Sequence, residues 1–224
     1  MFGMANIACA VPAFQEAGTA VASTGSVSPA WPAHAVNDVA LLFVESNGDE
    51  PATLSTPAGF AAVANSPQVA GNRTRITVFW ARATSTTMAA PTILDPGNHV
   101  YAQIVTYRSV ISTGNPWDVT GGGGKTAAST SVTVTGVTTT LADTLIVQAV
   151  ARDTDKAAAA FSAQANANLT GITERSDAGT GLGKGGGFGV WDGVKATASA
   201  TGDTTATVTS SRNAFLTIAL KPLL

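Results

Sequence analysis

An internal duplication constrains the fold of this chain more than any other feature. Residues Thr24–Val44 align without gaps on Ser129–Ala149, and further segments match in the same order after small gaps. Such a repeated order predicts two copies of one structural unit, which bury a shared core when they stack on each other. The matched pairs are Asp38 with Asp143, Leu41-Leu42 with Ile146-Val147, Val78-Phe79-Trp80 with Gly189-Val190-Trp191, and Tyr101–Val105 with Phe215–Ala219.

Each copy is predicted to consist of short β-strands. Thr and Val are frequent in the candidate segments, and their β-branched side chains fit the pleated surface of a sheet. Polar and apolar residues alternate, so that Ile76, Val78 and Trp80 lie on one face of their segment. The predicted strands are Val39–Glu45, Arg75–Arg82, Val100–Arg108, Ser131–Thr135, Thr144–Val150, Gly189–Lys195, Ala206–Ser210 and Ala214–Leu220.

We therefore predict an all-β fold: a jelly-roll-type antiparallel β-sandwich with an internal pseudo-two-fold duplication and at most one short helix. Residues 1–23 are expected to form an N-terminal arm and first strand. Residues 24–224 are expected to form a single sandwich made of two duplicated halves, 24–120 and 129–224. A half of ~110 residues that is rich in Ala and Gly has a thin core, which favours two halves packed face to face.

Two local alternatives stay open. Asp153–Lys156 is suited to cap a helix that continues through Ala157–Ala160 toward Leu169, because Ala favours helices and Asp favours their N-termini. The same stretch is equally consistent with an Ala-rich loop. The connection 111–129 contains Gly121–Gly124 and is suited to link two small sandwiches in tandem, instead of lying within one domain.

The composition excludes several classes of protein. Apolar residues make up 45% of the chain and the net charge is −2, which argues against intrinsic disorder. The 12 Lys and Arg residues are balanced by 14 Asp and Glu residues, so there is no basic footprint for nucleic acid. Cys9 is the single cysteine, and no apolar run of ~18 residues predicts a membrane-spanning helix. The N-terminus lacks the positive charge of a secretory signal.

The sequence offers no catalytic residues and no cofactor or metal site. Gly181, Gly183 and Gly186 satisfy G-x-G-x-x-G, but no strand precedes them and no helix follows, so we expect a flexible inter-strand loop. His34 and His99 are isolated from other ligands, and a metal site needs three or four. Calcium ligation by Asp49, Glu50 and Asp95 lacks supporting spacing. Asp38 and Asp143 are expected to cap turns.

The tryptophans are expected to serve mainly in core packing, with a partner-contact role considered only for Trp117. Trp80 and Trp191 are equivalent under the duplication and are expected in the core. Trp117 lies in the turn sequence Gly114–Asp118, where it either folds back onto the sandwich edge or anchors a partner. The candidate partner-contact residues are Asn115, Trp117 and Asp118.

The chain contains a characteristic succession of core and turn segments: Asp38–Val44, Pro57–Phe60, Val78–Arg82, Ala102–Val110, Gly114–Asp118 and Leu216–Pro222. This succession resembles the β-sandwich virion structural proteins of tailed bacteriophages and prophages, which are described as virion structural, tail-fibre-like or tail-associated. The resemblance spans Ala35 to Pro222 and implies a fold without catalytic residues. Because no shaft or coiled coil follows the sandwich, it favours a small accessory subunit over a complete tail fibre.

The resemblance implies a non-enzymatic subunit mounted on the outside of a virion, as a capsid decoration or a small tail or fibre component. Its expected partners are other virion proteins and copies of itself, without nucleic acid, membrane or cofactor, after assembly in the host cytoplasm. The uncharged segment Thr126–Leu141 is suited to add a strand to a neighbour's sheet edge. The alternative is a carbohydrate-binding module for a host surface glycan. That alternative requires two of Trp31, Trp117, Tyr101 and Tyr107 to be exposed and coplanar.

Overall fold

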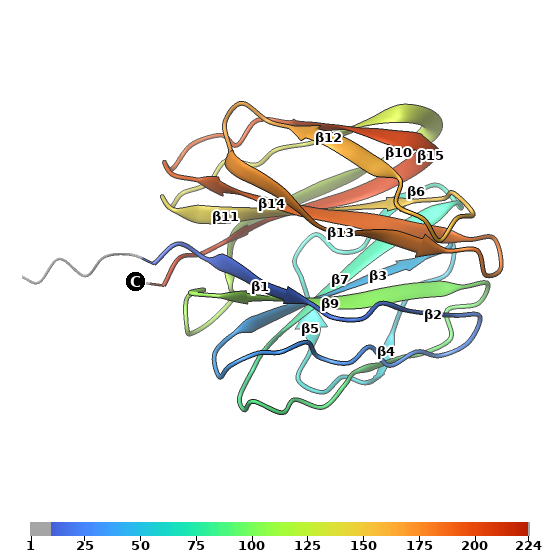
Figure 1. Ribbon diagram of the computed structural model, residues 1–224, viewed down its shortest axis with the longest axis horizontal. Coiled ribbons are helices and arrows are strands. Elements are labelled where there is room, and N and C mark those ends of the chain that lie inside the picture. The colour runs from blue at the N-terminus through green and yellow to red at the C-terminus, as the bar shows by residue number, and fades with distance from the viewer. Residues whose placement is uncertain (1–9, 224) are drawn as a thin grey trace, which may run out of the picture.

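The computed structural model describes residues 10–223 and contains two stacked antiparallel sheets, seen as two layers in Figure 1. No helix occurs among these residues, so the predicted all-β sandwich is confirmed. Residues 1–9 of the expected N-terminal arm, Cys9 included, lie outside the described part of the chain.

The first sheet is built from the first half of the chain. Its strands have the order β1-β9-β3-β7-β5, while β2 also pairs with β9 and β6 with β7. A small separate sheet joins β4 to β8. The strands are β1 (Ala13–Ala17), β2 (Val21–Ser23), β3 (Val39–Ser46), β4 (Leu54–Thr56), β5 (Ala61–Ala62), β6 (Gln68–Ala70), β7 (Thr74–Arg82), β8 (Thr92–Ile93) and β9 (Val100–Arg108).

The second sheet is built from the second half and repeats the order of the first. It runs β10-β15-β11-β14-β13, and β12 also pairs with β15. In both sheets the first strand, β1 or β10, lies at an edge and pairs with the last strand, β9 or β15. The strands are β10 (Trp117–Val134), β11 (Thr144–Arg152), β12 (Phe161–Ala165), β13 (Thr170–Thr180), β14 (Gly186–Lys195) and β15 (Thr204–Leu220).

The strand connections refine the jelly-roll expectation. Consecutive strands of a jelly roll pass between its two sheets, whereas here β1–β9 stay outside the second sheet and β10–β15 form it. The chain therefore crosses between the sheets once, from β9 to β10. Each half contributes one complete layer of the sandwich.

The main core lies between the two layers. Leu41 and Phe43 of β3 face Val147 of β11 and Leu216 of β15 in one buried cluster. The outer faces are covered as well, by loops and short strands of the same half. As a result β3 and β11 are buried on both faces, and each fully buried Leu or Val contributes roughly 1.5–3 kcal/mol.

The gap-free alignment of the halves is one residue out of register in the central strands. Leu41 faces the core between the sheets, whereas its aligned partner Ile146 lies in an outer cluster with Leu169 and Ala219. Side chains alternate between the faces of a strand, so a shift of one residue reverses every side chain. The inward residues of β11 next to Ile146 are Leu145 and Val147.

Trp80 and Trp191 are not equivalent, contrary to the prediction. Trp80 packs against the core between the sheets, and its ring meets Trp117 edge-on at a centroid distance of 5.7 Å. Trp191 lies in the outer cluster of the second sheet, where its Nε1 donates to Gln148 Oε1 at 2.8 Å. The shared Val–Trp pattern marks equivalent strands but not the same face.

The helical interpretation of residues 157–169 is wrong. Residues 153–160 form a loop, and β12 and the start of β13 follow it. The Arg152 guanidinium donates to the carbonyls of Thr154, Lys156 and Ala158, so the backbone of the loop is bonded without helical turns. Asp177 Oδ2 accepts from the amides of Ala160 and Phe161, which fixes the start of β12.

The linker interpretation of Gly121–Gly124 is also wrong, because all four residues lie in β10 and pair with β15. Glycine is required here by close packing between the two sheets. A Cβ at Gly122 would lie 2.6 Å from Gln68 Cγ, and one at Gly124 would meet the carbonyl oxygen of Val69. The run therefore lets β6 of the first sheet approach β10 of the second.

Candidate functional site at the polar end of the sandwich

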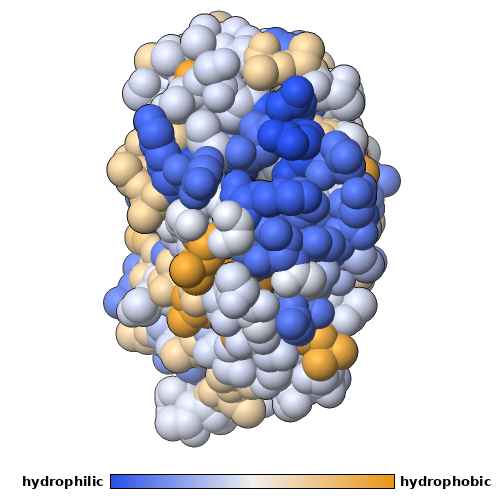
Figure 2. Space-filling model, turned by 90° about the vertical axis from the view of Figure 1, so that its right-hand side faces the viewer, coloured by the Kyte–Doolittle hydropathy of each residue, from blue (hydrophilic) through white to orange (hydrophobic). Residues whose placement is uncertain are grey.

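Charged and amide side chains gather at one end of the molecule, the face turned to the viewer in Figure 2. Loops from both halves meet there, as contacts across the sequence show. Asp153 bonds Arg73 and Arg212, and Asn98 Oδ1 accepts from the amide of Lys184. We call this region, formed by residues 45–50, 71–75, 95–99, 152–156 and 181–186 together with Arg212, the polar end.

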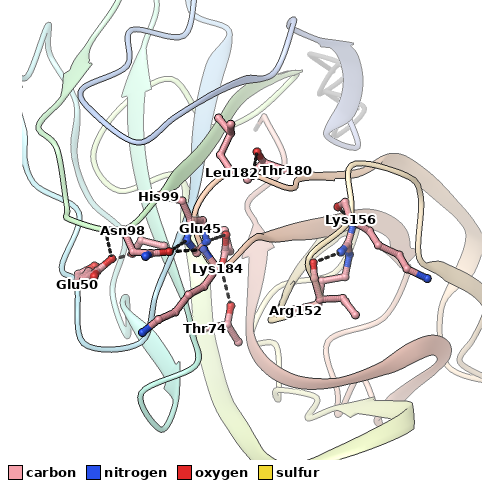
Figure 3. Close-up of polar contacts among 12 residues, drawn as sticks. Glu45, Glu50, Thr74, Asn98, His99, Arg152, Lys156, Thr180, Leu182 and Lys184 are labelled. Atoms are coloured by element: carbon pink, nitrogen blue, oxygen red, sulfur yellow. Dashed lines mark hydrogen bonds and ion pairs between the residues drawn. The ribbon is translucent and has the colours of Figure 1, made fainter.

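A buried carboxylate–imidazole pair lies beneath the polar end. Glu45 is at the end of β3 and His99 directly precedes β9, and neither side chain has any exposed surface. His99 Nε2 lies 3.0 Å from Glu45 Oε2, and Thr74 Oγ1 donates to Glu45 Oε1 at 2.9 Å. Figure 3 shows the three side chains converging from β3, β7 and the start of β9.

Asn98 connects this pair to the surface. Its backbone N–H donates to Glu50 Oε2 at 2.7 Å, and its side-chain Oδ1 lies 3.1 Å from His99 Nδ1. The same Oδ1 accepts from the backbone amide of Lys184, so it is an acceptor and His99 Nδ1 must carry a proton. The 181–185 turn of the second half is thereby bonded to the first half.

Burial and pairing shift both pKa values of the pair upward. Burial raises the pKa of Glu45, against the opposing effects of His99, Thr74 and Arg152. Burial alone would lower the pKa of His99, but its hydrogen bond to Glu45 and the nearby carboxylates outweigh this and raise it. With Nδ1 already protonated, Glu45 Oε2 and His99 Nε2 hold one further proton between them.

Arg152 is the buried cation of the polar end. It is the last residue of the mainly apolar strand β11 and is fully buried. Its guanidinium donates three hydrogen bonds to loop carbonyls at 2.8–3.1 Å. Its Nε has no partner among the described residues. Burial lowers the pKa of Arg152, while the charges of Asp177 and Glu45 act in the opposite direction.

The geometry suits structural cohesion better than chemistry on a ligand. The side chains of Glu45 and His99 are inaccessible to solvent in this conformation, so no substrate reaches the shared proton. A Cβ at Gly186 would meet the Glu45 carboxylate, so β14 closes directly over the pair. The pair, its partners and Arg152 instead join the loops of the two halves at one end.

The candidate partner-contact residues have different environments. Asn115 is exposed. Trp117 is half-buried and folds back against Trp80, as the packing alternative predicts. Asp118 accepts from the amides of Thr140 and Leu141 and from the Thr140 hydroxyl, so it fixes a turn of the second half.

None of the four aromatic residues that the glycan alternative requires is fully exposed. Tyr101 and Tyr107 are buried in the core between the sheets, and Trp117 packs on Trp80. Trp31 lines an open groove of about 520 Å³ with His34, Thr87 and Met88, but its ring packs against the rings of His34 and Phe60. The coplanar pair of exposed rings is therefore not formed by these residues.

The remaining polar motifs have structural partners. Gly179–Gly187 forms a hairpin between β13 and β14, and its turn docks on Asn98 and Asp155. Within residues 10–223, no three His, Cys, Asp or Glu side chains gather as a metal ion would need. Glu50 and Asp95 instead accept from the backbone amides of Asn98 and Gly97. No helix of the described chain is long and apolar enough to cross a membrane.

Comparisons with known proteins returned no match to a family model, to a curated protein or to a solved structure.

Proposed function

We propose that this protein is a non-enzymatic structural subunit of a bacteriophage virion, mounted on the outside of the particle as a capsid decoration or a small tail or fibre component. It acts through contacts with other virion proteins and with copies of itself. The proposal starts from the succession of core and turn segments between Ala35 and Pro222, which resembles such proteins.

One structural observation carries the proposal: the long edge strand β10 is open to another protein. From Thr126 to Ala142 the chain has no charged residue and no proline, and most of residues 126–131 are exposed. An exposed strand edge without charge or proline is a template for pairing with another chain. By contrast, the titratable groups of the polar end are largely engaged in contacts within the chain.

The experiment is to purify particles on a density gradient from a culture that produces the protein with an epitope tag. We expect the tagged chain to sediment with intact particles at a fixed copy number. Hundreds of copies per particle place it on the capsid or tail tube, and a handful on the tail tip, collar or fibres. Recovery of the chain only in the soluble fraction, with particles complete without it, contradicts the proposal.

A further inference from the structure

The four edges of the two sheets differ in how they resist pairing with another chain. In the first sheet, β1 has five residues with an irregularity at Phe14/Glu16, and β5 and β6 have two and three residues. In the second sheet, β13 carries Glu174, Arg175 and Asp177 and has two irregularities in its pairing. Shortness, bulges and charges are the devices that block edge-to-edge pairing.

The remaining edge, β10, has 18 residues and lacks charges after Lys125. It too contains bulges, but they compensate each other: the pairs Lys125–Asn213 and Ser131–Thr207 enclose equal lengths of the two strands. Beyond them Ser131–Val134 pairs regularly with β15. Val132 and Val134 pack into the outer cluster and hold the strand against its own half. Ser131 and Thr133 on the other face are exposed to solvent.

Opposite charges lie at the two ends of the uncharged part of β10, residues 126–134. Lys125 stands at its start and is exposed. At its other end, Asp203 is exposed and its Oδ1 accepts from the amide of Gly136 at 3.0 Å. When two such runs lie antiparallel around a two-fold axis near Thr130, Lys125 of each copy comes opposite Thr135 of the other copy, and Asp203 of that copy lies next to Thr135 on its β15 side, within reach of the long lysine side chain.

We propose that two copies of this chain pair through β10, antiparallel and around a two-fold axis, so that their second sheets join into one continuous sheet. The inference deepens the proposed function and rests on it, because a virion subunit is present in several copies. Backbone hydrogen bonds between the two β10 strands supply the pairing, and the two Lys125–Asp203 contacts set its direction and register. A two-fold contact uses the same surface on both copies, as this edge allows.

The test measures self-association of the purified full chain by analytical ultracentrifugation. We expect a dimer in the wild type and a dissociation constant at least about tenfold higher for Thr130→Lys, which places a lysine of each copy at the axis and brings two like charges together. The matched control is Thr173→Lys, which adds the same charge to an exposed threonine on the opposite edge strand, β13, and is expected to dimerise like the wild type.

Charge reversal tests the register with variants that leave β10 itself almost unchanged. Lys125→Glu is expected to weaken the dimer, and adding Asp203→Lys to it is expected to restore dimerisation. Circular dichroism and thermal unfolding identify any variant that fails to fold, in which case the other pair of variants decides.

Several outcomes overturn the inference. A wild type that stays monomeric at its highest soluble concentration does so, as does a dimer that Thr173→Lys disrupts and Thr130→Lys leaves intact. A monomer that still sediments with particles refutes the β10 dimer while leaving the virion proposal standing. A β10 dimer that never enters particles supports the inferred pairing and contradicts the virion proposal.

Discussion

The buried pair of Glu45 and His99 makes the stability of the protein depend on pH in a direction that the structure fixes. The pKa of His99 is raised above its ordinary value of 6.5 in the folded chain. Its contribution to the unfolding free energy is therefore fully present below pH 6.5 and is lost as the pH rises through the folded pKa. The pKa of Glu45 is raised from 4.5, so its linkage has the same sign and begins at lower pH.

Other buried carboxyl groups contribute linkages of both signs. Burial alone would raise the pKa of Asp38, but its bonds to Arg108 and to the amide of Ala35 outweigh this and lower it. Its linkage therefore has the opposite sign and acts below pH 4. Asp177 and Asp192, whose pKa values burial raises from 3.8, add to the decline that Glu45 causes as the pH rises. The decline above pH 6.5 reaches at most about 1.4 kcal/mol per pH unit for each proton released.

The perturbation is the double variant Glu45→Gln, His99→Gln, which removes both titrating groups while keeping polar side chains beside Thr74 and Asn98. We expect the pH dependence between pH 6.5 and 9 to flatten in urea unfolding curves measured at several pH values. The single variant His99→Gln leaves Glu45 buried without its ionic partner and costs up to about 3–5 kcal/mol, less where Glu45 takes up a proton.

The chain has two histidines, so His34→Gln is a matched control for the loss of an imidazole. His34 lies in the Trp31 loop, where its Nδ1 bonds the Pro32 carbonyl, so its variant measures what the loss of an imidazole outside the buried pair does to stability. A wild type whose stability rises from pH 6.5 to 9, or a double variant with an unchanged slope, refutes the reasoning.

Three further predictions concern the two ends of the sandwich. Arg152→Met leaves three loop carbonyls without their buried donor, so we expect a loss of about 3 kcal/mol and faster hydrogen exchange in residues 153–158. Gly124→Ala forces a methyl group against the neighbouring sheet and is expected to cost about 1–3 kcal/mol in thermal unfolding, whereas Gly25→Ala, with room for its Cβ, changes little. Trp117→Ala removes the ring that packs on Trp80 and is expected to cost about 2–3 kcal/mol; a neutral effect would favour an anchor awaiting its partner.

The central strands could be predicted because each is a long run of apolar residues. The predicted Val100–Arg108 agrees with β9, and Val39–Glu45 and Thr144–Val150 lie inside β3 and β11. Most edge strands were missed because exposed strands have little alternation to detect; the exception is the predicted Ser131–Thr135, which overlaps β10. Thr173–Asp177 is not among the predicted strands but lies in β13, where a half-exposed strand keeps Glu174 and Asp177.

The register of the duplication was predicted wrongly for a related reason. The strands β3 and β11 are buried on both faces, so their sequences are mainly apolar on both faces and do not alternate in a way that shows which residues point inward. The inward face of each is determined by packing against the opposite sheet. An alignment of such runs can slip by one residue without any loss of similarity, as Leu41 and Ile146 did.

The polar end was missed because its residues come from six separate parts of the chain, yet each central strand held a signal. The apolar run of β3 ends in Glu45, and the apolar run of β11 ends in Arg152. Where a strand is buried on both faces, a charged side chain at its end carries a large desolvation cost unless an opposite charge or hydrogen bonds compensate it. Because the two sheets stack with both central strands ending at the polar end, the charge of Arg152 favours the ionised form of Glu45. Opposite charges that close two equivalent apolar runs thus predict that those two ends meet in the fold.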